Sequence, residues 1–311
     1  MNFRIRSFLK RIAINFPIFR ILRFKSVVLY SKAKMKKARQ VFERSSDTPP
    51  WLEPDHLEFL QRRYPFPPEY GYRPVDLERR GRERSAEILT LLSKMTERRG
   101  TIRHFLELGC WDGMVSHALQ RSGKVTTAID HRSEGFDKRA LRRGVSLLKM
   151  DAEQLGFEDE SFDCIFSYES FEHFSDPEAV LREAIRVVRK GGFVYLAFGP
   201  LYMSPMGLHA YRSITVPYCH FLFPLEVLDE FCTRKSLTNI HVDELNRWSL
   251  NDYRELWEAY AHRVKKVLYR EIPDTSHVDV IIKHPSCFRS KTDAFDNLVV
   301  STIEVLFVKM R

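Results

Sequence analysis

The segment from Arg103 to Gly113, RHFLELGCWDG, constrains the fold of this chain more than any other part. A short apolar strand ends here in an acid and two glycines, and the residues from Met114 to Arg121 predict a helix. Because Gly109 and Gly113 lack a Cβ, the backbone can turn sharply and a ligand can lie directly against it. Open α/β sheets bind ligands at such strand ends, so we expect Glu107 to point its carboxylate into a crevice there.

The spacing of the glycines separates two classes of cofactor. The dinucleotide fingerprint GxGxxG needs glycine at positions 109, 111 and 114, and the chain has Gly109, Trp111 and Met114. A nicotinamide cofactor is therefore disfavoured. The pattern ExGxxxG, from Glu107 to Gly113, instead resembles the first motif of class I S-adenosylmethionine (SAM)-dependent methyltransferases. Trp111 departs from that family, which often has a glycine at this position.

Further strands are expected to alternate with helices along the chain. The apolar runs predict strands over Val125–Ile129, Val145–Met150, Ser161–Tyr168, Phe193–Phe198, Leu237–Leu245 and Asn297–Lys309. The periodic segments predict helices over Arg84–Arg98, Pro177–Lys190, Leu225–Cys232 and Leu250–Tyr269. This alternation predicts a doubly wound parallel sheet. The resemblance implies an α/β, Rossmann-like sheet of seven mostly parallel strands whose last strand is antiparallel, preceded here by a helical arm.

The resemblance also implies which residues bind SAM. Asp130 ends the second strand 17 residues after Gly113, where a carboxylate suits the two hydroxyls of a ribose. Asp151 and Ala152 follow the third strand and resemble the family's adenine-side motif. The expected cofactor-binding residues are therefore Glu107, Gly109, Cys110, Gly113, Asp130, Asp151, Ala152 and Ser167.

Methyl transfer to a hydroxyl needs a group that removes one proton, and histidine, with an unperturbed pKa of about 6.5, is the usual base. His173 lies after the fourth strand in the sequence ESFEHF, which resembles the E-H loop of small-molecule methyltransferases. His209 lies after the fifth strand in the proline-rich stretch 199–223. Both are catalytic candidates, and a purely structural hydrogen bond is the alternative for each. His220, within the apolar sequence HFLF, is expected to pack.

Other kinds of site are disfavoured. Cys219, His220, Cys232 and His241 do not have the spacing of a zinc ligand pair, so no metal site is predicted. None of the five cysteines forms a CxxC pair, which favours a reduced, cytoplasmic protein. Enzymes that methylate amino groups of DNA bases generally have an NPPY-like loop after the fourth strand, and this chain has SYES there. The Pro-Cys nucleophile of C5-pyrimidine methyltransferases does not occur. Nucleic acid is therefore a disfavoured substrate.

The positive net charge of the chain belongs to its first residues. Residues 1–42 carry 12 Lys or Arg and no acid, so the net charge of +9 leaves +9 − 12 = −3 for the rest. Ile5, Phe8, Leu9, Ile12 and Phe16 share one helical stripe among basic residues, which suits an anionic membrane surface. A cleaved targeting peptide, an RNA contact and a packed arm are the alternatives.

The expected organisation has three parts: a basic arm over residues 1–45, a proline- and aromatic-rich wrap or lid over residues 46–83, and a SAM-dependent methyltransferase domain over residues 84–311. Within that domain, residues 200–224 are expected to form a substrate loop and residues 247–295 an insertion. The helix Leu250–Tyr269 could cap the pocket, form a homodimer contact or simply pack.

Together these features predict a methyltransferase that transfers methyl from SAM to a small-molecule hydroxyl, of a sugar, a glycan precursor or a natural product. The alternatives are a quinone or lipid methyltransferase and a non-catalytic partner protein with the same fold. The location is expected to be cytoplasmic, with peripheral attachment to a membrane through residues 1–42.

Overall fold

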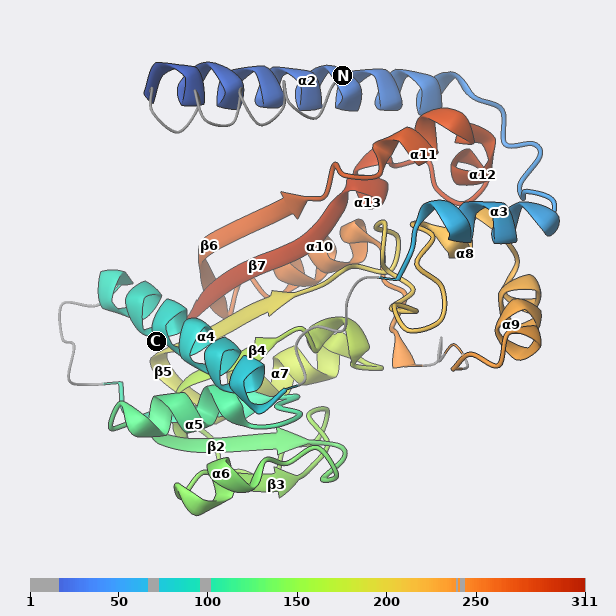
Figure 1. Ribbon diagram of the computed structural model, residues 1–311. Helices are drawn as coiled ribbons and strands as arrows, with labels where there is room; N and C mark the ends of the chain where they lie inside the picture. Colours follow the sequence, from blue (N-terminus) through green and yellow to red (C-terminus); the bar gives the residue numbers. More distant parts are fainter. Residues whose placement is uncertain (1–16, 67–72, 96–101, 239, 241–243, 311) are drawn as a thin grey trace. The chain divides into compact units, whose positions relative to one another are not determined.

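The computed structural model describes residues 17–66, 73–95, 102–238, 240 and 244–310 of the 311-residue chain (Figure 1). The chain divides into two compact units. The larger unit consists of Glu53–Asp274 and Asp296–Arg311, and the smaller unit of Met1–Leu52 and Thr275–Phe295. The predicted boundaries at residues 45 and 83 differ from these. Residues 275–295 are grouped with the N-terminal segment and not with the domain in which an insertion was expected.

The larger unit is built on a seven-stranded sheet with the order β3-β2-β1-β4-β5-β7-β6. The first five strands in sequence pair in parallel, and β7 is antiparallel to both of its neighbours. The predicted doubly wound fold with an antiparallel last strand is confirmed. The strands are β1 (His104–Leu108), β2 (Val125–Asp130), β3 (Ser146–Lys149), β4 (Phe162–Tyr168), β5 (Val188–Phe198), β6 (Val264–Pro273) and β7 (Val300–Lys309).

Helices cover both faces of this sheet (Figure 1). On one face, α4 (Pro74–Met95) and α5 (Met114–Arg121) bury Ile88 and Leu119 among aromatic side chains of β1, β4 and β5. On the other face, α7 (Pro177–Val187) and α10 (Leu250–Ala259) pack on β4, β5 and β7. The remaining helices of this unit are α3 (Asp55–Arg63), α6 (Lys138–Arg142), the 3-10 turn η1 (Phe171–His173), α8 (Cys219–Leu222) and α9 (Leu225–Arg234). The short helix α13 (Phe295–Val299) lies at the boundary and leads into β7.

One glycine brings α4 close to the start of α5. A Cβ at Gly81 would lie 2.3 Å from the carbonyl oxygen of Met114, the first residue of α5. Because that atom belongs to the backbone, it cannot move aside as a flexible side chain would. Gly81 therefore sets the approach of α4 to the helix that follows the glycine turn.

Several predicted element bounds were wrong. Helix α4 begins at Pro74, inside the segment predicted to lack long helices, because proline is favoured in the first turn of a helix. Helix α7 ends at Val187, before the two glycines predicted to end it. The predicted helix Leu250–Tyr269 ends at Ala259, and its last part belongs to β6. No strand is found in the described part of the prediction Leu237–Leu245, which also includes residues outside the described ones.

The apolar face of α10 is buried within the chain. Tyr253 and Trp257 are each 1% exposed, and both pack in the core cluster that includes β5 and β7. This burial accounts for the apolar spacing that could also have indicated a homodimer contact. Packing was therefore the correct alternative for this helix.

The smaller unit joins helix α2 (Pro17–Arg44) to α11 (Val278–Lys283) and α12 (Pro285–Arg289). Phe42 of α2 is fully buried, with its ring centroid 5.7 Å from that of Phe295. The last turns of α2 are thus packed, while the predicted stripe from Ile5 to Phe16 lies outside the described residues. Among the described helices, none has both the length and the apolar character of a membrane span.

Candidate active site

The sequence-predicted cofactor residues gather where the parallel strands end. In the ladder, Leu108 pairs with Ile129 and Asp130 pairs with Lys149, so the turn after β1, the end of β2 and the loop after β3 are neighbours. Strand β4 lies on the other side of β1, at the point where the strand order reverses. We call this row of strand ends, from β3 through β5, the carboxyl edge.

The two glycines of the turn are required by the packing of the protein itself. Gly109 has φ +67°, and a Cβ there would lie 2.5 Å from the Cβ of Ser170. The Ser170 hydroxyl donates a hydrogen bond to the Gly109 carbonyl at 2.8 Å. Gly113 has φ +70°, and a Cβ there would lie 2.6 Å from Leu147 of β3. The glycines thus permit left-handed backbone and close contacts to β3 and to the loop after β4.

Glu107 points toward α5, which differs from the orientation expected from the sequence. Its Oε2 accepts hydrogen bonds from the backbone N–H and the hydroxyl of Ser116, at 3.1 Å and 2.6 Å. The side chain is buried, and this burial raises the pKa of Glu107 to about 8, although the Ser116 hydroxyl acts in the opposite direction. The recorded contacts of Glu107 therefore tie β1 to the start of α5.

Asp130 holds the turn and leaves acceptor capacity for a ligand. Its Oδ2 accepts the backbone N–H of Trp111 at 2.9 Å, and its Oδ1 accepts that of Arg132 at 3.1 Å. Each carboxylate oxygen can accept a second hydrogen bond. The Trp111 ring is 47% exposed, and its atoms lie 3.2 Å from the place where a Gly135 Cβ would be. The Trp111 ring therefore lies beside the loop after β2. The backbone of Trp111 is left-handed, with φ +49°.

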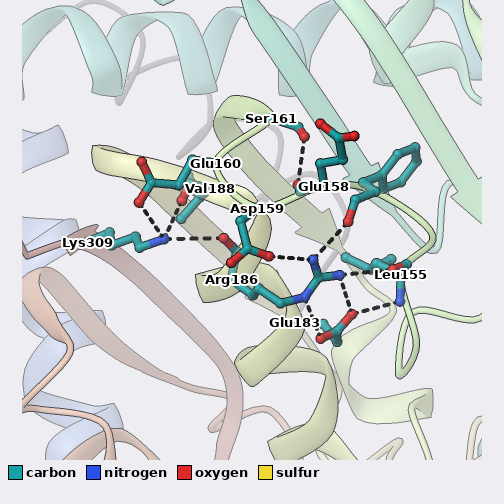
Figure 2. A network of polar contacts seen from close by, with 10 residues as sticks. Leu155, Glu158, Asp159, Glu160, Ser161, Glu183, Arg186, Val188 and Lys309 are labelled. Carbon is teal, nitrogen blue, oxygen red and sulfur yellow. Dashed lines mark hydrogen bonds and ion pairs between the residues drawn. The ribbon is translucent and has the colours of Figure 1, made fainter.

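The loop after β3 is fixed by Arg186 of α7, as Figure 2 shows. The Arg186 guanidinium donates to the carbonyls of Leu155 and Phe157, at 2.9 Å and 2.8 Å, and to both carboxylate oxygens of Glu183. Glu183 in turn accepts the backbone N–H of Leu155 at 2.9 Å. This clamp begins three residues after Ala152, so the sequence DAEQL that carries Asp151 and Ala152 runs directly into it.

Asp151 and Ala152 differ in their surroundings. The Asp151 carboxylate is exposed, and its Oδ1 accepts the backbone N–H of Glu153 at 2.9 Å. Ala152 is 6% exposed and packs in the core. The Asp151 carboxylate is therefore accessible to a ligand, whereas the Ala152 side chain is not.

Two other residues expected to bind the cofactor have buried side chains with contacts inside the protein. The Cys110 side chain packs with Ala128 and Ala140, and burial raises the pKa of its thiol. The Ser167 hydroxyl is fully buried and donates to the Leu108 carbonyl at 2.9 Å, between β4 and β1. The sequence placed both correctly at strand ends, but it did not show that their side chains point into the protein.

The two candidate catalytic histidines, 36 positions apart in the sequence, are brought together. The ring centroids of His173 and His209 are 4.8 Å apart. His173 Nδ1 lies 2.7 Å from the Glu244 carbonyl, and His209 Nε2 lies 2.8 Å from the Pro200 carbonyl. Because carbonyls only accept, these nitrogens carry the hydrogens, and the other nitrogen of each neutral ring is an acceptor. Desolvation lowers the pKa of His173, and burial brings that of His209 to about 4, so His209 is uncharged at neutral pH.

Glu172 is a functional candidate that the sequence analysis did not select. It is 2% exposed, its Oε1 accepts the Gly199 N–H at 3.1 Å, and its Oε2 has no hydrogen-bond partner. Burial raises the pKa of Glu172 to about 8. One donor atom from each of Glu172, His173 and His209 lies within 4.8 Å of those of the other two. The signal was present in the pair Glu172-His173, of which only the histidine was chosen.

A cavity of about 240 Å³ adjoins this cluster. It is bounded by α4 and by β4 to β7, and the Gly199 that bonds to Glu172 is part of its wall. The wall mixes apolar side chains such as Phe198 and Ile272 with polar ones: the Tyr168 hydroxyl donates to Glu87 at 3.1 Å, and the Tyr195 hydroxyl donates to Glu304 at the same distance. Arg84 and Glu169 form an ion pair of 2.5 Å at the same cavity.

Cys219, His220 and Cys232, whose spacing did not suit a zinc site, pack inside the protein. Cys219 and Cys232 are buried, and His220 bonds through Nε2 to the Tyr202 carbonyl at 2.7 Å. Burial lowers the pKa of His220 to about 4, as expected for a packed ring. His241 lies outside the described residues.

The segment that forms the carboxyl edge matches a known sequence family. A family model described as a methyltransferase domain matches residues 106–196, from within β1 to within β5. This segment is a class I SAM-dependent methyltransferase domain. The methyltransferase domain therefore includes the glycine turn, Asp130, Asp151 and His173, and its cofactor is SAM.

Individual relatives resemble parts of the chain. Two are named ubiquinone biosynthesis O-methyltransferase. The one from Parvibaculum lavamentivorans is 30% identical over 98 residues, which cover 30% of this chain and 39% of that protein. The one from Aeromonas salmonicida is 29% identical over 150 residues, covering 40% of this chain and 63% of that protein. The chain thus spans less than two thirds of either relative's length. Among solved structures, the YcgJ protein of Bacillus subtilis is 20% identical with a TM-score of 0.43, covering 73% of this chain and 99% of that chain.

The residues at the carboxyl edge fit SAM chemically. Asp130 Oδ2 accepts only the Trp111 N–H among its recorded contacts, so it retains an acceptor site for a ribose hydroxyl, whereas Oδ1 accepts the Arg132 N–H and lies 3.2 Å from His131 Nδ1. The exposed Asp151 carboxylate can accept hydrogen bonds from the amino group of an adenine. These two residues end neighbouring strands, so one nucleoside can contact both.

Proposed function

We propose that this protein transfers a methyl group from SAM to a hydroxyl of a hydroxyl-rich small molecule, such as a sugar or glycan precursor. The observation that carries the proposal is the meeting of two features at one sheet edge. Asp130 ends β2 and Asp151 lies two residues after β3, while His173 and His209 follow β4 and β5.

In this proposal the two halves of the edge have separate tasks. When bound, SAM supplies an electrophilic methyl group on a sulfonium. Asp130 and Asp151 hold the nucleoside at the β2 and β3 ends, while Gly109 and Gly113 keep the turn open beneath it. Alignment of the acceptor oxygen with the methyl group is the main catalytic requirement.

The acceptor is proposed to lie in the cavity that Gly199 shares with the histidine cluster. Its wall offers three carboxylates, Glu87, Glu169 and Glu304, which accept hydrogen bonds from hydroxyls. Tyr168 and Tyr195 add hydroxyl groups to the same wall. These carboxylates and hydroxyls can hydrogen-bond an acceptor with several hydroxyls, which supports the sugar assignment.

Proton removal is proposed to occur at His173 and His209. The pKa of both imidazoles is lowered, that of His209 to about 4, and each ring has one nitrogen bonded to a backbone carbonyl. The other nitrogen is the one that faces a proton to be removed. The left-handed φ of His209, +56°, is a locally unfavourable conformation of the kind found at functional sites.

The direct test is methyl transfer from radiolabelled SAM to a panel of sugars, sugar nucleotides and phenols. His209→Ala and His173→Ala are expected to keep SAM affinity and lose turnover by about 100-fold or more. His262→Ala, at an exposed position, is the matched control and should retain activity. Glu87→Gln should raise the KM of the acceptor without changing SAM affinity. Turnover that is unchanged in both histidine variants would contradict the assignment.

A quinone-like phenol is a second candidate acceptor. The printed names of the two relatives favour it, although each match covers at most 40% of this chain. A phenol ionises more readily than a sugar hydroxyl, so it depends less on the histidine pair. Preferential methylation of the phenols in the panel would favour this candidate over the sugar.

We also propose that the basic N-terminal segment attaches the protein to anionic membranes. The support is its composition, with 12 basic and no acidic residues among positions 1–42. Because Phe42 is packed in the smaller unit, deletion of residues 1–42 would remove core contacts. Deletion of residues 1–16 is the better test. It removes four of the 12 basic residues and the apolar stripe, so it should weaken sedimentation with phosphatidylserine vesicles at low salt, and unchanged binding would contradict the proposal.

A further inference from the structure

The cluster of Glu172, His173 and His209 has an unusual hydrogen-bonding balance. His173 donates through Nδ1 to the Glu244 carbonyl, and His209 donates through Nε2 to the Pro200 carbonyl. The nitrogens left over, Nε2 of His173 and Nδ1 of His209, are therefore lone-pair acceptors. Glu172 Oε2 is buried and has no partner. Once Glu172 is ionised the cluster offers only acceptors, and its recorded contacts supply no donor to Glu172 Oε2.

A divalent cation satisfies such a group of acceptors. We infer that Glu172, His173 and His209 form the protein ligands of a first-row divalent metal ion at the acceptor side of the carboxyl edge. Two imidazoles and one carboxylate are a donor set suited to Zn²⁺ and related ions. With three protein ligands, the ion keeps a coordination position open for water or for an oxygen of the acceptor.

The surroundings of the cluster resemble those of metal ligands. Metal-binding histidines commonly donate their second N–H to a backbone carbonyl, and both rings do so here at 2.7 Å and 2.8 Å. The remaining Glu172 oxygen, Oε1, is held by the Gly199 N–H at 3.1 Å. The backbone thus orients one atom of each ligand and leaves the other for the ion.

The distances require only a small closure. The three donor atoms lie within 4.8 Å of one another. Ligands bound to a tetrahedral ion at about 2.1 Å are about 3.4 Å apart, so the side chains must approach by roughly 1 Å.

A role of the bound ion in methyl transfer rests on the proposed function, whereas cation binding itself does not. With the ion bound, the imidazoles act as ligands and no longer as the direct base. An acceptor hydroxyl on the open position would ionise at a lower pH, its O–H bond giving the proton to water and the oxygen keeping the electron pair. The ion would therefore take over the proton step that the metal-free pair performs.

Co²⁺ is the probe for the test, because its visible absorption reports imidazole and carboxylate coordination. The full chain, stripped of metal with a chelator, is titrated with Co²⁺ and followed by absorption and calorimetry. We expect one ion per chain with a visible absorption band. His209→Ala and Glu172→Gln should weaken binding by about 10-fold or more. His262→Ala should bind like the native chain.

The Glu172→Gln variant separates metal binding from folding. Glutamine keeps an oxygen that can accept the Gly199 N–H, so the fold is preserved, and its thermal midpoint verifies this. A Co²⁺ spectrum identical to that of the free ion, or binding unaffected by either substitution, would overturn the inference. SAM titration of the same metal-stripped protein reports separately on the proposed function, since Asp130 and Asp151 are not among the metal ligands.

Discussion

Replacement of Asp130 by asparagine tests the two roles that the structure assigns to this carboxylate. Its two oxygens hold the backbone N–H groups of Trp111 and Arg132, at 2.9 Å and 3.1 Å, and the same oxygens are proposed to accept the ribose hydroxyls. An asparagine of the same shape has one acceptor oxygen and one NH₂ group. Asp130→Asn therefore loses one hydrogen bond to the turn and at least one to the ribose.

The magnitudes follow from the worth of hydrogen bonds to charged groups, about 1.5–3 kcal/mol each. One lost ribose bond should weaken SAM binding by about 10- to 150-fold, since about 1.4 kcal/mol corresponds to tenfold. The lost turn bond should lower the free energy of unfolding by about 1–3 kcal/mol. Calorimetric titration with SAM measures the first effect, and urea unfolding measures the second. Asp293→Asn, at an exposed position of the smaller unit, is the matched control.

The two measurements discriminate between explanations. Unchanged SAM affinity in folded Asp130→Asn protein would refute the ribose assignment. A loss of stability alone would mean that Asp130 serves only to hold the glycine turn.

Three further predictions concern the scaffold. Gly81→Ala should lower the free energy of unfolding by about 1–3 kcal/mol, because the new Cβ would lie 2.3 Å from a backbone oxygen of α5. This clash outweighs the higher helix propensity of alanine, and a more stable variant would contradict the packing. The pKa of Glu107 is raised to about 8, so its contribution to stability is present below about pH 4.5 and is lost as pH rises through about 8. Glu107→Gln should therefore remove the loss of stability between about pH 4.5 and pH 8, and free energies of unfolding in urea that depend equally on pH in both proteins would disprove it. Lysine in place of Arg186 cannot reproduce the hydrogen bonds to Leu155, Phe157 and Glu183. Arg186→Lys should therefore lower the free energy of unfolding by about 2 kcal/mol and weaken SAM binding. Native SAM affinity by calorimetry would show that these bonds do not support the cofactor site.

The sheet was predictable where local signals were strong. Helix α5 has the predicted bounds, because a glycine turn begins it and a serine and a glycine follow it. Strand β6 was missed because the apolar spacing of Leu250–Ala259 continued through Val264, and no proline or glycine marks the end of α10. A helix period that continues by chance into a strand cannot be recognised from one sequence.

The site was predictable in composition but not in side-chain direction. The sequence selected His173 and His209 separately, and the fold places their rings 4.8 Å apart. It could not show that Glu107 turns toward Ser116 or that Ser167 bonds inward to Leu108. Both orientations depend on neighbours that lie far along the chain or across the sheet. Glu172 was missed for the same reason, since its importance comes from an unpartnered oxygen beside two rings.

The central claim is that the carboxyl edge binds SAM, and calorimetric titration of the purified protein with SAM and with S-adenosylhomocysteine tests it most directly. We expect one site per chain for both ligands, with dissociation constants on the order of micromolar. The absence of binding for both would contradict the account. It would mean that Trp111 and its neighbours close the turn to the cofactor, and it would support a non-catalytic role for this methyltransferase domain.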